Sequence, residues 1–159
     1  INVASYAYID FFGMTESVFG IFFAINAVVG IVGSLAYMRA SSVKTKRTIN
    51  AGLLVAAACA GAMLLAGSLS PVAFLLCMLP FTFIQNFTRP LITNVLMRNA
   101  DRNAGAVSSF IIFIWTALGC CGMASMSLGW SGYVSGLGTA MMAFTLMAAL
   151  TWAFTRKKV

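Results

Sequence analysis

Long apolar segments alternate with short polar gaps along the whole chain. Five segments reach the roughly 20 residues that a membrane-spanning helix needs: residues 18–38, 48–68, 71–97, 104–128 and 134–154. A shorter one, residues 1–12, is expected to be the end of a span, so that the sequence is the C-terminal part of a longer chain. Because the gaps are short and carry no Ser/Pro-rich linker, the pattern predicts an all-α integral membrane protein. We expect a single domain over residues 1–159, a six-helix bundle whose first helix is truncated.

The basic residues fall almost entirely in every second gap. Of the ten Lys and Arg residues, four lie at positions 39–47, two at 98–102 and three at 156–158, whereas residues 10–17 carry only acidic charge. Lys and Arg in short loops mark the cytoplasmic face of a membrane protein. The alternation therefore predicts a cytoplasmic C-terminus, and we expect the protein in the bacterial cytoplasmic (inner) membrane.

Composition narrows the classes of function. Hydrophobic residues make up 61% of the chain and charged ones 8%, with a net charge of +7. Since the basic residues flank spans, we expect membrane lipids as partners and no nucleic acid. The chain has no His and three acidic residues, so it has few side chains that could act as a general acid or base or bind a metal. We therefore expect no enzyme activity, no cofactor and no metal.

Polar residues within the spans are unevenly distributed. The segments 48–68 and 134–154 are nearly apolar, whereas the other four carry amides, hydroxyls or charges. Polar groups in a membrane protein face the bundle interior or a water-filled cavity. Four helices are therefore expected to line a wet interior and two to face lipid.

The segment 71–97 is the most polar of these. Its side chains recur at three- or four-residue steps on one helix face: Thr82, Gln85, Asn86, Arg89 and Thr93. Pro80 and Pro90 lie inside this helix, where each removes a backbone hydrogen bond and permits a kink, so we consider both as gate or kink positions. Arg89 is expected either to reach the headgroups or to bind charge within the bundle.

Local signals mark helix ends and one gate candidate. Thr15 precedes the segment 18–38 at a capping distance, and Ser70-Pro71 predicts a helix start. Asp10 follows the first apolar stretch. Because water is near there, we interpret Asp10 as an outer gate or a boundary residue rather than a proton-coupling group.

Three stretches carry a resemblance to a known family: FGIFFAIN at residues 19–26, PLITN at 90–94 followed by AGAVSS at 104–109, and the basic loop after Gly33. The whole chain resembles the C-terminal half of a major facilitator superfamily transporter, most like the drug/proton antiporter group that includes Bcr/CflA-like multidrug efflux proteins. The resemblance implies a twelve-helix fold in which the seventh, eighth, tenth and eleventh helices line a central cavity. The N-terminal six-helix half, in the same polypeptide or as a partner, would be missing here.

The family implies secondary active transport by alternating access, here proton-driven efflux of small organic compounds or drugs. The expected cavity residues are these: Tyr6, Tyr8, Asn26, Gln85, Asn86, Arg89, Ser109 and Trp115. Two alternatives remain open. One is metabolite uptake by another branch, with Arg89 binding an anionic group; the other is a non-transporting membrane scaffold or assembly subunit.

Overall fold

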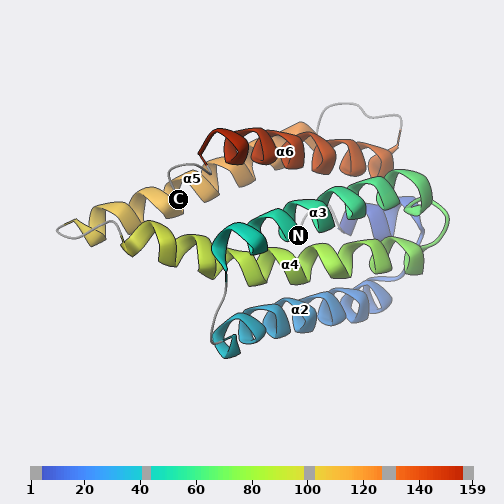
Figure 1. Cartoon of the computed structure of the whole chain (residues 1–159). Helices are drawn as coiled ribbons and strands as arrows, with labels where there is room; N and C mark the ends of the chain where they lie inside the picture. Colours follow the sequence, from blue (N-terminus) through green and yellow to red (C-terminus); the bar gives the residue numbers. More distant parts are fainter. Residues whose placement is uncertain (1–4, 41–43, 99–102, 127–131, 156–159) are drawn as a thin grey trace.

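The computed structural model describes residues 5–40, 44–98, 103–126 and 132–155, and these ranges are helical without any strand. A short π-helix is followed by five long α-helices: η1 (Tyr6–Phe11), α2 (Glu16–Arg39), α3 (Thr45–Ala66), α4 (Pro71–Arg98), α5 (Ala104–Met126) and α6 (Tyr133–Thr155) (Figure 1). All five long helices are long and apolar enough to cross a membrane. The prediction of an all-α chain is confirmed for the described residues, and the five long helices are compatible with a membrane bundle.

The helix boundaries follow local chemistry. The five long helices begin and end within three residues of the predicted segments. The predicted start at Ser70-Pro71 is confirmed, because the Ser70 hydroxyl accepts a hydrogen bond from the Ala73 N–H at 3.1 Å. Thr15 stands at the N-cap of α2 without a side-chain cap bond. The turn into α2 depends on Gly13, whose φ of +63° is open to glycine at little cost.

Helix α4 lies at the centre of the bundle. It packs against α2 on one side and α3 on the other, and α3 packs in turn against α6. Figure 1 shows this order as α2, α4, α3 and α6 across the molecule. Helix α4 separates α2 from α3, although these two helices are consecutive in the chain. Two chain reversals divide α2 from α4, so these two packed helices run in the same direction.

The best-packed part of the core is an aromatic cluster at the end of the bundle opposite the basic loops. Phe74 of α4 and Tyr8 of η1 are buried with an edge-on ring contact of 5.0 Å between centroids. Phe22 of α2 lies 5.3 Å from the same tyrosine ring. Met63 and Val134 complete the buried cluster and bring α3 and α6 into it. Rings in such edge-on and tilted pairs close this end of the bundle.

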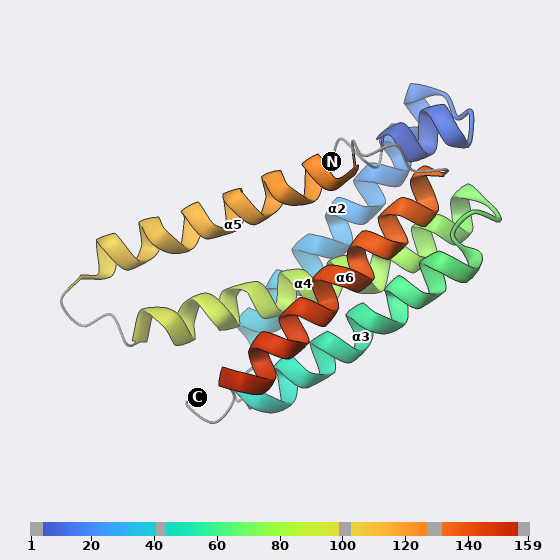
Figure 2. The ribbon, with the colours of Figure 1, turned by 90° about the horizontal axis from the view of Figure 1, so that it is seen from above.

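Helix α5 differs from the other long helices because it lies at the edge. Figure 2 shows it to one side of the remaining helices. It makes far fewer contacts with α4 and α6 than α2 makes with α4. Large side chains such as Phe110, Ile112 and Phe113 are mostly exposed along it, while Ile111 is buried. Helix α5 is therefore attached to the bundle along a narrow strip.

Candidate binding site

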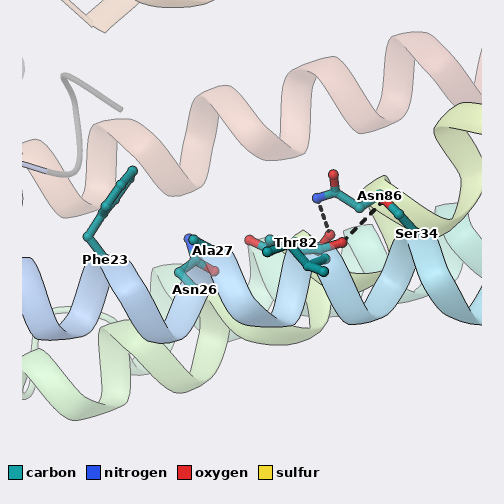
Figure 3. Close-up of a pocket in the computed structure, with 8 residues that line it drawn as sticks. Phe23, Asn26, Ala27, Ser34, Thr82 and Asn86 are labelled. Carbon is teal, nitrogen blue, oxygen red and sulfur yellow. Dashed lines mark hydrogen bonds between the residues drawn. The ribbon is translucent and has the colours of Figure 1, made fainter.

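A polar hollow lies between α2 and α4, away from the aromatic cluster and within both spanning helices. Its volume is 280 Å³. We call it the α2–α4 hollow, and its lining consists of Phe23, Asn26, Ala27, Gly30, Ile31 and Ser34 from α2 with Thr82 and Asn86 from α4. Figure 3 shows the polar members of this set at the junction of the two helices. Amides and hydroxyls at that depth indicate a place for a polar or partly polar ligand.

Two glycines of α2 bring the helices close enough to form the hollow. A Cβ at Gly33 would lie 2.6 Å from the backbone carbonyl oxygen of Phe83, which is too close for any side chain. A Cβ at Gly30 would lie 3.2 Å from the side-chain nitrogen of Asn86. Small residues allow such close backbone approach in membrane helices. The glycines thus set the spacing at which Asn26 and Asn86 line one space.

Two of the four polar side chains of the hollow form a hydrogen bond within their own helix. The Asn86 Nδ2 donates to the Thr82 carbonyl at 2.8 Å, and the Ser34 hydroxyl donates to the Gly30 carbonyl at 3.3 Å (Figure 3). The Oδ1 of Asn26 is different, because this oxygen is buried and accepts no hydrogen bond from the residues that the structure describes. A buried unpaired acceptor costs about 1–3 kcal/mol. A ligand can reach this oxygen only when the Asn26 side chain turns toward the hollow, and a donated hydrogen bond would then remove that cost.

The prolines of α4 leave the helix continuous. Pro80 and Pro90 both lie within the single helix α4, so the structure shows no break at either gate candidate. Pro90 has no N–H to offer the carbonyl of Asn86, four residues earlier. This places a backbone acceptor with reduced pairing beside the hollow.

Arg89 turns toward α5 rather than α2. Its guanidinium carbon lies 3.9 Å from the ring centroid of Trp115, a cation–π contact that joins α4 to α5. The polar face of α4 therefore serves two neighbours, with Asn86 toward α2 and Arg89 toward α5.

The remaining predicted residues are distributed over the molecule. Gln85 is exposed on α4, Ser109 is exposed on α5, and Asp10 is exposed on η1 beside the aromatic cluster. The structure does not place Tyr8 on a cavity wall, because four neighbouring rings bury it in the core. The side chain of Tyr6 lies outside the described residues. Of the eight predicted cavity residues, the hollow brings together Asn26 and Asn86.

The sequence reasoning missed part of the hollow on α2. Ser34, Gly30 and Gly33 were not among the predicted cavity residues, although Asn26, Gly30 and Ser34 repeat at four-residue steps on one helix face. That spacing, combined with a glycine pair three residues apart, was the available signal. Thr82 was recognised on the polar face of α4 but was not assigned to a cavity.

Comparison with known proteins gives no relatives for this chain: no family model, no curated protein and no solved structure matches it.

Proposed function

We propose that this chain is the C-terminal, cavity-lining half of a secondary active transporter of the major facilitator type, most like the drug/proton antiporters. It would export small organic compounds by alternating access, driven by protons. The α2–α4 hollow carries the proposal, because it sets two amides and two hydroxyls within spanning helices. An unpaired acceptor on Asn26 supports a ligand with a hydrogen-bond donor. The flanking Phe23 and Ile31 supply apolar contact for an amphipathic compound.

Accessibility to water tests whether the hollow belongs to a transport pathway. In the full gene product with Cys59, Cys77, Cys120 and Cys121 replaced by alanine, we place a single cysteine at Asn86 or at Met147. Met147 is exposed on α6, where we expect lipid. A charged, membrane-impermeant thiol reagent should modify the cysteine at Asn86 at least about tenfold faster, because only that position has access to water. Equal protection of both positions contradicts the transporter and favours a membrane scaffold.

Transport itself is measured in everted vesicles with ethidium as the probe. Asn26→Leu should reduce proton-driven ethidium transport by about tenfold, which corresponds to one lost hydrogen bond of about 1.4 kcal/mol. Two matched variants each remove one hydroxyl. Thr82→Val removes it from the hollow, and Thr151→Val removes it from the exposed face of α6. Loss with Thr82→Val alone supports the hollow as the site. Equal activity of all three variants with the wild type argues against it.

Arg89 favours a second candidate function, the transport of an organic anion. The guanidinium lies over the Trp115 ring, and its N–H groups are donors of the kind that bind a carboxylate or phosphate. Arg89→Gln should then abolish transport of an anionic compound while transport of ethidium continues. If Arg89→Gln leaves anion transport unchanged, this candidate is excluded.

A further inference from the structure

A second cavity lies at the basic end of the bundle, where α2 ends, α3 begins and α4 ends. Its volume is 340 Å³, and we call it the basic-end pocket. Its lining consists of Tyr37, Met38, Ala40, Thr45, Leu91, Asn94, Val95 and Arg98. The helices that form it are spanning helices, so their ends lie at the level of the lipid headgroups. The pocket therefore opens at the depth where the polar and apolar parts of a lipid meet.

Among the described residues, the charged side chains at and next to this pocket are all basic. Arg98 lines it, and Arg39 and Lys44 are exposed next to the lining residues Met38, Ala40 and Thr45 in the chain. Among the described residues, the carboxylates Asp10 and Glu16 lie at the opposite end of α2. Asp101, the nearest acidic residue in sequence, lies outside the described residues. The surroundings of the pocket favour an anion.

A prepared hydrogen-bond donor points to the same chemistry. The Asn94 Nδ2 donates to the Tyr37 hydroxyl oxygen at 2.8 Å, so the tyrosine acts as acceptor in that bond. Its own O–H hydrogen has no acceptor among the described residues. The Tyr37 ring is held edge-on against Phe87, with centroids 5.7 Å apart. The Tyr37 O–H and the Arg98 guanidinium line the same pocket, and both are donors that suit the acceptor oxygens of a phosphate.

The rest of the lining is apolar. Met38, Leu91 and Val95 form the other part of the wall. A free phosphate ion makes no use of such a surface, whereas a phospholipid carries its acyl chains directly beside the phosphate. We propose that the basic-end pocket binds the phosphate of an anionic phospholipid, with Arg98 and Tyr37 on the phosphate and the apolar wall against the lipid tail. This inference does not depend on the transport function.

Lipid titration of the purified full gene product in detergent tests the proposal. Native mass spectrometry compares binding of phosphatidylglycerol with that of phosphatidylcholine. Fluorescence titration follows at about 0.5 M salt, where diffuse surface attraction is screened. Arg98→Gln should weaken phosphatidylglycerol binding about tenfold, because a charge-assisted contact is lost. Arg47→Gln, which removes the same charge outside the pocket lining, should change it by less than about twofold. Equal weakening by both variants overturns the proposal in favour of a diffuse basic surface.

A second variant and a competitor separate the remaining explanations. Tyr37→Phe keeps the ring and removes the O–H donor, so phosphatidylglycerol should bind about threefold to tenfold more weakly. Inorganic phosphate at millimolar concentration should not displace the lipid if the apolar wall contributes. Displacement by phosphate identifies a free-anion site and overturns the lipid assignment. Equal binding of phosphatidylcholine and phosphatidylglycerol overturns it as well.

Discussion

The two neighbours of α4 illustrate two ways of joining membrane helices. Against α2, Gly33 brings the backbones together, with the Phe83 carbonyl and the Asn86 Cβ next to it. Against α5, contacts are sparse, and one cation–π pair between Arg89 and Trp115 bridges the helices. Inside a bilayer, helix association removes no apolar surface from water. Helix pairs therefore depend on close packing and polar contacts. The α2–α4 pair uses packing, whereas the α4–α5 pair uses mainly a polar contact.

This difference bears on movement. A closely packed glycine interface has few alternative arrangements, because shifting it opens voids. Helix α5 has few contacts with α4 and α6, so a change in its position costs less free energy. We infer that α2, α3, α4 and α6 move as one body in any transport cycle, and that α5 is the helix that shifts. The following variants test that comparison.

The largest expected effect is at the aromatic cluster. Phe74 is fully buried at the junction of α4 with η1 and α2, whereas Phe113 is 67% exposed on α5. Phe74→Ala should lower the free energy of unfolding by about 3–5 kcal/mol through lost contacts and the cavity left behind. Phe113→Ala should lower it by less than about 1 kcal/mol. Unfolding in mixed detergent micelles measures both, and similar losses would show that α5 is as firmly packed as the core.

A smaller effect is expected where α2 meets α4. Gly33→Ala should destabilise the protein by about 1–3 kcal/mol, because the new methyl group meets the Phe83 carbonyl and forces the helices apart. Gly20 lies on the same helix with nothing within 4 Å, and Gly20→Ala serves as the control. That control should be neutral or stabilising by up to about 1 kcal/mol. A neutral Gly33→Ala would mean that the backbones are not in contact there.

The smallest effect is expected at the α4–α5 contact. A double-mutant cycle with Arg89→Gln and Trp115→Leu should give a coupling energy of about 0.5–1 kcal/mol, as for a partly exposed cation–π pair. The cycle of Arg89→Gln with Phe113→Leu provides the comparison and should give a coupling near zero. Equal coupling in both cycles would remove the special role of Trp115. Loss of the contact should also raise the mobility of a spin label on α5 relative to one on α6.

Several features of the fold were accessible from the pattern of apolar residues. The helix bounds of α2 to α6 followed from segment length and from signals such as Ser70-Pro71. The polar face of α4 followed from three- and four-residue spacing, and Asn86 on this face lines the hollow together with Asn26 of α2. Tyr8 shows the opposite case. Its hydroxyl suggested a cavity wall, yet the ring area decided its place in the core.

The run of apolar residues in each segment is enough to predict a helix long enough to span a membrane, because backbone groups in lipid must be paired within the helix. The tertiary structure decided which helices are neighbours. The positions of Gly30 and Gly33 in the sequence do not indicate which helix packs against them. The structure shows that α4, and not the consecutive helix α3, lies there. It also decided how one polar face divides, with Asn86 toward α2 and Arg89 toward α5. Spacing along a helix fixes which side chains share a face, while the partner of that face depends on contacts between residues far apart in the chain.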